Sequence, residues 1–235
     1  MKVLVEFSDE EITSYSLDTV KLIIIEEKTG IQTIKYVSME SLASVLHASL
    51  ETKKMCSVGP IPFGYYNAKI CVEGGGFGCR AILIVPKKVH RITYMNTAYD
   101  IELPSTVFGF WVEKYCLIRT KVFCMENRVP SGKCRLYHFP LGNVREDGHV
   151  CWGNNPLPRI ERLLDLESLI IRFFAYPFNS DYFQPGLQCR IKDYNLRDLC
   201  EYVHRTGEFE EKKLLEPIVQ AGVRTLGEFQ KTMEI

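Results

Sequence analysis

The stretch that decides the fold of this chain runs from Tyr137 to Trp152 and reads YHFPLGNVREDGHVCW. Gly148 permits a tight turn just before Cys151, and a Gly-Asn-Asn-Pro sequence follows Trp152 at once. Cys151 is therefore expected at the end of an extended piece rather than inside a helix or strand. A thiol at such a position is chemically useful, because an acyl group can reach its thiolate.

Asn143 lies eight residues before Cys151, and Asp147-Gly148 forms a turn between them. Such a turn can bring the Asn143 carboxamide back beside the sulfur, where its N–H can stabilise an oxyanion. Losing one donor of this kind typically costs about 3–4 kcal/mol in the transition state. From the residues alone a second interpretation stays open, in which Cys151 is a core residue beside Trp152 and Asn143 only forms a turn.

The remaining cysteines give no sign of a second chemical site. The chain has nine, an odd number, at positions 56, 71, 79, 116, 124, 134, 151, 189 and 200. No two are two to four residues apart, so the close pairs of a zinc site are missing. Most are expected to be small buried hydrophobes. The sequence thus predicts one reactive thiol, with no metal and no cofactor.

Composition limits the class of protein. The 235 residues are 46% hydrophobic and 11% aromatic, which is enough for a packed core and argues against disorder. Lys plus Arg equals Asp plus Glu at 29 each, so the basic excess typical of nucleic-acid binders is absent. The apolar run Leu22–Ile25 is far shorter than a membrane span, and the N-terminal run is too short for a signal peptide. We expect a cytoplasmic protein that binds neither membrane nor nucleic acid.

The order of predicted elements indicates an α+β fold. A pair of strands, a helix and a turn-rich connection come first: Val20–Glu27, Ile31–Val37, Met39–Lys53 and Gly59–Gly64. A β-meander follows: Ala68–Glu73, Cys79–Val85, Arg91–Tyr94, Val107–Val112, Tyr115–Cys124 and Cys134–Phe139. Helices are predicted after Cys151, at Leu164–Phe174 with Asp165 as the cap, at Asn195–His204, and over Glu208–Lys231 with interruptions near Pro217 and Gly222.

The segment Tyr137–Trp152 resembles the active-site stretch of ubiquitin-conjugating enzymes. In those enzymes the Asn of a His-Pro-Asn motif precedes the acyl-accepting cysteine by eight residues, and a Gly lies three residues before the cysteine, as Asn143, Gly148 and Cys151 do here. The chain is most similar to the prokaryotic ubiquitin-conjugating-like family that includes protein B of the PRTRC gene system. That similarity covers roughly residues 38–185 and also involves Val58–Pro62, Leu136–Pro140 and Phe173-Phe174.

The resemblance implies a fold and a division of the chain. Members of the class have a first helix, a four-stranded antiparallel meander, the cysteine loop and a buried crossing helix. The predicted elements follow this order, which gives an N-terminal β extension (1–37), a ubiquitin-conjugating-like core (38–188) and a C-terminal helical extension (189–235). The sequence departs from the motif directly before Asn143, where Leu141 and Gly142 replace the His and Pro.

The resemblance also implies an acyltransferase activity. A ThiF-like activating enzyme would load the C-terminus of a ubiquitin-like protein onto Cys151, Asn143 would steady the oxyanion, and a JAB-type peptidase would act in the same pathway. His149 and Asp181 are candidates for an assisting role. Two alternatives remain, a non-catalytic interaction module of the same fold, and a thiol hydrolase, which needs a His within hydrogen-bond reach of Cys151.

Overall fold

The computed structural model describes residues 2–6, 19–26, 32–38, 55–57, 64–73, 76–126, 128–220 and 222–235. The chain divides into two compact units, Met1–Lys54 and Met55–Ile235, and each is described by itself. The predicted helix Met39–Lys53 lies outside the described residues, and so does the connection Gly59–Gly64 apart from Gly64. The domain boundaries at residues 37 and 188 stay predictions.

The described part of the first unit is an antiparallel sheet in the order β1-β2-β3. Its strands are Lys2–Glu6, Thr19–Ile25 and Gln32–Ser38. The pairing of β2 with β3 runs from Thr19 opposite Ser38 to Ile25 opposite Gln32. Both strands predicted from the β-branched and apolar residues of this segment are therefore confirmed.

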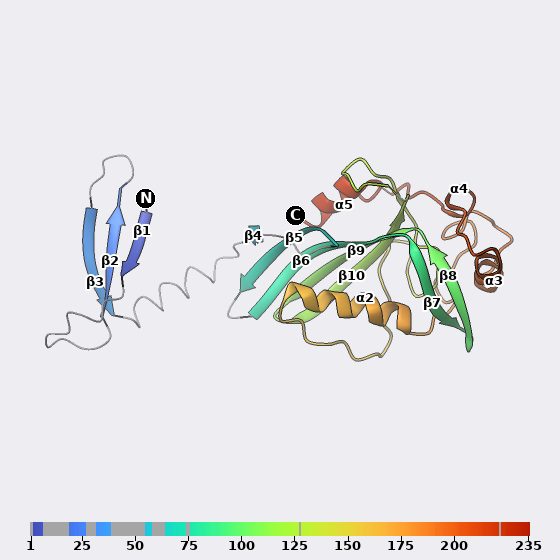
Figure 1. The fold of residues 1–235 in the computed structure, drawn as a ribbon, viewed down its shortest axis with the longest axis horizontal. Helices are drawn as coiled ribbons and strands as arrows, with labels where there is room; N and C mark the ends of the chain where they lie inside the picture. The colour runs from blue at the N-terminus through green and yellow to red at the C-terminus, as the bar shows by residue number, and fades with distance from the viewer. Residues whose placement is uncertain are drawn as a thin grey trace. The chain divides into compact units, whose positions relative to one another are not determined.

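The main sheet of the second unit is antiparallel, and its described strands have the order β11-β10-β9-β6-β5-β4 (Figure 1). They are Met55–Ser57 (β4), Tyr65–Glu73 (β5), Gly76–Val85 (β6), Ser105–Glu113 (β9), Cys116–Met125 (β10) and Leu136–Tyr137 (β11). β9 is buried from Ser105 to Val112, which explains the absence of polar side chains from Val107 to Val112. The meander predicted from the sequence is confirmed, although the last strand is shorter than the predicted Cys134–Phe139.

A hairpin of β7 (Lys88–Tyr94) and β8 (Thr97–Leu103) is inserted between β6 and β9. Its two turn residues have positive φ, 46° at Met95 and 63° at Asn96, as a tight two-residue hairpin turn requires. We did not predict β8, although its buried residues alternate with more exposed ones.

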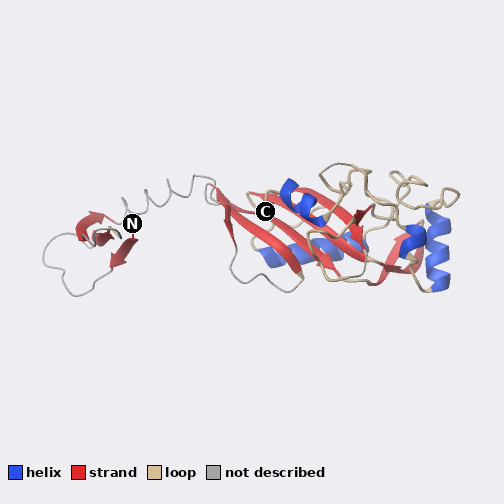
Figure 2. Cartoon of the chain, turned by 90° about the horizontal axis from the view of Figure 1, so that it is seen from above, coloured by secondary structure: helices blue, strands red, loops and turns tan. Residues whose placement is uncertain are grey.

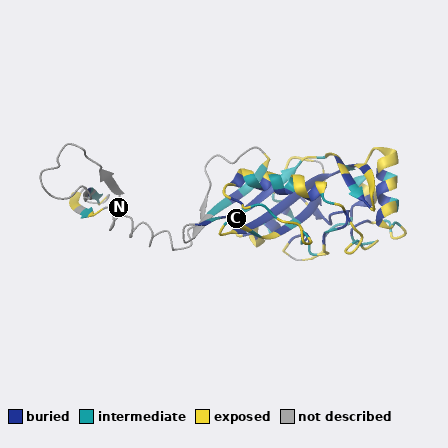
Figure 3. Cartoon of the chain, turned by 90° about the horizontal axis from the view of Figure 1, so that it is seen from below, coloured by how far each residue is buried: buried dark blue, intermediate teal, exposed yellow. Residues whose placement is uncertain are grey.

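Helices close both faces of the main sheet (Figure 2). α2 (Leu166–Ala175) packs on one face, where the Phe173 ring lies edge-on to Phe108 at 5.5 Å between centroids. α5 (Leu226–Thr232) packs on the other face over Gly109, where an added Cβ would lie 2.4 Å from the Phe229 ring. Figure 3 shows the strands between them as buried. The helix predicted at Leu164–Phe174 is confirmed, and a short 3-10 turn, Leu163–Asp165, precedes it.

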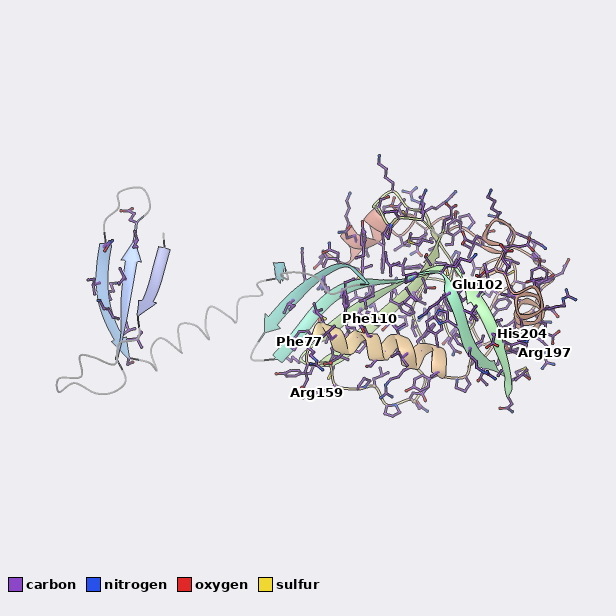
Figure 4. All side chains as sticks on the ribbon, in the orientation of Figure 1. Phe77, Glu102, Phe110, Arg159, Arg197 and His204 are labelled. Carbon is purple, nitrogen blue, oxygen red and sulfur yellow. The ribbon has the colours of Figure 1, made fainter. Side chains whose placement is uncertain are left out.

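The C-terminal region follows the prediction only in part. α3 (Leu196–Thr206) confirms the helix predicted at Asn195–His204, and the Asn195 side chain caps it by accepting from Asp198 N. It lies beside β8 (Figure 4), where His204 Nδ1 accepts from Asp100 N at 3.1 Å. The helix predicted over Glu208–Lys231 is wrong for most of its length. Among the residues of this range that the structure describes, only α4 (Glu211–Leu214) and α5 are helical. The segment between them pairs with the free edge of β11, where Leu136 N donates to Arg224 O at 2.9 Å and Leu136 O accepts from Ile218 N at 3.2 Å. Pro217 and Gly222, the two predicted interruptions, lie in this segment.

Candidate functional site

The segment Asn143–Cys151 is a small hairpin. Cys151 N donates to Asn143 O at 2.8 Å, and Arg145 N donates to His149 O at 2.9 Å. The turn closes with Gly148 N donating to Arg145 O at 2.9 Å, and Gly148 has a φ of +82°. This is the geometry of a three-residue hairpin loop that ends in a left-handed glycine. The interval of eight residues therefore makes Asn143 and Cys151 backbone neighbours.

The hairpin is attached to β10. Val122 N donates to Gly148 O at 2.8 Å, and Val150 N donates to Thr120 O at 3.0 Å. The Val150 side chain is buried in the core shared with α2. Cys151 follows directly and is exposed to solvent. The sheet thus holds the chain up to the residue before the thiol and leaves the thiol itself accessible.

Trp152 anchors the chain on the far side of Cys151. Its Nε1 donates to Thr120 Oγ1 at 3.3 Å. Its ring lies edge-on to Phe173 and Tyr176 of the α2 end, at 6.1 and 6.4 Å between centroids. These contacts make Trp152 a packing residue. Cys151 is held between two fixed neighbours.

Cys151 and Asn143 line one small cavity of about 90 Å³. Its other walls include Trp152, Tyr176, Asn179 and Tyr182. The structure therefore brings together the two predicted site residues, from the two ends of the hairpin. Tyr176, Asn179 and Tyr182 were not predicted, because they reach the cavity from a segment that begins 25 residues after Cys151 in sequence.

The Asn143 side chain has a fixed orientation. Its Oδ1 accepts from Asn179 N at 3.1 Å, and its Nδ2 donates to Pro177 O at 2.9 Å. An asparagine amide has two N–H donors, so one N–H of Asn143 is left for a further acceptor. The backbone has a φ of +61°, which asparagine tolerates better than most residues. Asn143 therefore suits both this backbone conformation and the donor role.

The two residues that depart from the His-Pro-Asn motif have structural explanations. Leu141 is fully buried in the core. A Cβ added at Gly142 would lie 1.7 Å from Asn179 O, so only glycine allows the segment after α2 to approach so closely. Leu141 therefore fills the core. Gly142 leaves room for the segment after α2, which holds the Asn143 amide.

His149 does not take part in the cavity. Within the described residues no hydrogen bond joins it to Cys151, and it does not line the cavity. Partial burial lowers the pKa of His149, with the cations Arg145, Arg119 and Lys121 acting in the same direction and Asp147 opposing. Its imidazole is thus neutral at pH 7 and supplies no positive charge. The described histidines include no candidate base for a thiol hydrolase at this cavity.

Asp181 lies close to the site but not in the cavity wall. It is exposed, and its Oδ2 accepts from Asn179 Nδ2 at 2.9 Å, while its own N donates to Asn179 Oδ1 at 3.2 Å. Asp181 is thus connected to Asn143 through Asn179. Asn179 begins an Asn-Ser-Asp sequence, which is typical of a turn. This turn pattern is the only sequence signal for the segment that brings Asn179 into the cavity wall.

The described residues contain no group of three or more His, Cys, Asp or Glu side chains arranged to hold a metal ion. No described helix has the length and the apolar content that a membrane crossing requires.

Comparison with known proteins defines the family. A curled antiparallel sheet with few helices is compatible with a ubiquitin-conjugating-like α+β fold. The chain belongs to prokaryotic E2 family D, whose profile matches residues 60–216, more than half of the chain; E2 denotes the ubiquitin-conjugating class. No curated protein and no solved structure gives a significant match. The family suggests a role in ubiquitin-like conjugation.

Proposed function

We propose that this chain is a conjugating enzyme that carries the C-terminus of a ubiquitin-like protein on Cys151. The Cys151 thiolate attacks the thioester carbonyl presented by a ThiF-like activating enzyme, and the thiol of that enzyme leaves. An acceptor amine then attacks the new thioester, an amide forms and the Cys151 thiol is released. The observation that carries the proposal is that Cys151 is exposed and shares its cavity with Asn143.

Asn143 stabilises the negative charge that develops on the carbonyl oxygen in both steps. Its remaining N–H is the donor, and its other polar groups are held by Asn179 N and Pro177 O. A donor that is already oriented costs no reorganisation when the charge develops. Asn143→Asp keeps a residue that tolerates positive φ but removes both N–H donors. It should slow transfer by about 100- to 1000-fold, the usual cost of losing one oxyanion donor.

The direct test is incubation with the activating enzyme, ATP and the cognate ubiquitin-like protein. We expect an adduct that reductant cleaves and that is absent in Cys151→Ala. Cys116→Ala is the matched control, because Cys116 is also exposed but lies outside the cavity. No adduct on the wild-type chain, or an adduct that survives in Cys151→Ala, would refute the proposal. A JAB-type peptidase that releases the ubiquitin-like protein is the expected neighbour in the pathway.

A non-catalytic interaction module is the second candidate, favoured by Leu141 and Gly142 in place of the motif's His and Pro. Alkylation of the native protein with iodoacetamide, mapped by peptide, separates the two. A working Cys151 reacts much faster than Cys116, which is also exposed, whereas an interaction module without thiol chemistry needs no difference between two exposed thiols.

A further inference from the structure

The segment that follows α2 holds the Asn143 amide and is itself held in place. Phe178 is buried, and its N donates to Thr93 O at 2.7 Å, which fixes the segment to β7. Beyond it, Asn179 and Asp181 exchange two hydrogen bonds, at 2.9 and 3.2 Å. These two bonds close a turn directly next to the Asn179 N–H, which donates to Asn143 Oδ1.

We propose that the Asn179–Asp181 pair is a positioning device for Asn143, and this inference rests on the proposed function. The pair fixes the direction of the Asn179 N–H. The Asn179 N–H needs an acceptor, so the carboxamide of Asn143 turns its oxygen toward it. Pro177 O needs a donor, so the same carboxamide turns its nitrogen toward Pro177. Asp181 acts through Asn179 and Asn143, and it is not a base for the acceptor amine.

The orientation of an amide is otherwise easily lost. An asparagine side chain that rotates by half a turn exchanges its donor and acceptor ends, and would then present oxygen where nitrogen is needed. An amide oxygen pointing at the developing oxyanion would repel it. The close approach of Asn179 O to Gly142 keeps the two segments in contact. The turn therefore needs to be rigid at Asn179, and the Asp181 carboxylate supplies this rigidity from outside the cavity.

The two roles for Asp181 differ in what the position must provide. An acceptor base needs a carboxylate at position 181. A positioning pair needs only one donor and one acceptor facing each other across the turn. Exchanging the two residues, Asn179→Asp with Asp181→Asn, moves the carboxylate but restores the pair, because Asn at 181 can donate to Asp at 179. In the exchanged variant, the backbone N–H of residue 181 can still donate to a side-chain oxygen of residue 179.

The experiment compares Asp181→Ala, Asn179→Ala and the exchanged double variant in discharge of preloaded Cys151 thioester. We expect each single variant to slow discharge by about 10- to 100-fold, the scale of a misplacement near 1 Å, and the exchange to recover most of it. The shape of the pH–rate profile should not change. An exchanged variant as slow as Asp181→Ala would overturn the proposal.

Two acceptors sharpen the result. Hydroxylamine is already unprotonated at neutral pH and needs no base, whereas an alkyl amine does. A positioning defect slows both acceptors equally, because both pass through the same oxyanion. A defect that disappears with hydroxylamine would identify Asp181 as an acceptor base and overturn the proposal.

A measurement that needs no activity completes the test. The Asn143 amide proton that is bonded to Pro177 O, assigned by its loss in Asn143→Asp, should be slow to exchange in the wild type and fast in Asp181→Ala. Unchanged exchange would overturn the positioning role. Absence of any Cys151 adduct on a wild type in which this proton is protected would instead refute the proposed function, so the two failures can be told apart.

Discussion

Cys151 and Cys200 carry the same thiol in opposite surroundings. Cys200 faces the core from α3, is fully buried, and burial raises its pKa to about 12, as it does for Cys79 in β6. Cys151 is the last residue of a hairpin that pairs with β10, and its side chain is open to solvent. The comparison teaches that placement within the sheet, rather than residue type, separates a candidate nucleophile from a packing residue.

The largest difference between these cysteines should appear when each is replaced by alanine. Cys151→Ala should abolish the thioester adduct and leave the free energy of unfolding almost unchanged, because the side chain is exposed. Cys200→Ala should keep the adduct and lose about 1 kcal/mol of stability, the usual cost of one small buried group. Adduct formation and denaturant unfolding measure the two effects. Loss of the adduct in Cys200→Ala at intact stability would contradict the comparison.

Gly142→Ala should produce the next largest effect, through the cavity wall. The added Cβ would meet Asn179 O at 1.7 Å and push the segment after α2 away from Asn143. We expect thioester discharge to fall by about 100-fold, as for a displacement near 1 Å, and stability to fall by about 1–3 kcal/mol from overpacking.

Gly207→Ala is the matched control for this prediction. Gly207 ends α3 at a φ of +71°, and a Cβ there meets nothing within 4 Å. It should lose about 1 kcal/mol of stability from backbone strain and leave discharge unchanged. Equal discharge rates for Gly142→Ala and wild type would show that the wall does not position Asn143.

The sequence was sufficient for those parts of the site that are set by local spacing. The turn at Gly148 and the interval of eight residues predicted that Asn143 and Cys151 would be neighbours, and the hairpin has them bonded through their backbones. Asn179 could not be predicted, because its contact with Asn143 spans 36 residues and depends on where α2 ends. Glycine at position 142 looked like a departure from the motif, and only the approach of Asn179 O explains it.

The fold shows the same limit. Strands with a clear apolar pattern were predicted close to their observed positions, because burial of one or both faces imposes that pattern. The segment between α4 and α5 was predicted to be helical, although it pairs with β11. Its apolar residues, such as Ile218 and Val223, are buried by distant partners that no local pattern specifies.

Two histidines, the buried His90 and the partly exposed His149, show the same contrast between buried and exposed side chains through their pKa values. His90 is buried against Phe174, with 3.7 Å between ring centroids, and burial lowers its pKa to about 4. Since the unfolded pKa is near 6.5, protonation favours the unfolded chain, and stability should fall by about 2–3 kcal/mol between pH 6.5 and pH 4. His90→Phe keeps a ring for stacking and should lose this part of the pH dependence. Parallel pH–stability curves for the variant and the wild type would contradict the assignment.

His149 should give the smallest effect, although it lies two residues from Cys151 in sequence. Its pKa is lowered by partial burial, so it carries no positive charge at neutral pH that could stabilise the thiolate. His149→Gln should therefore change thioester discharge and iodoacetamide alkylation by less than about twofold, since no charge near the sulfur is removed. Alkylation rates measured from pH 6 to pH 10 give the thiol pKa in both proteins. A clear rise of the thiol pKa in His149→Gln would mean that the imidazole is charged beside the sulfur. The reactivity of Cys151 would then depend on this neighbour as well as on its place at the end of the hairpin.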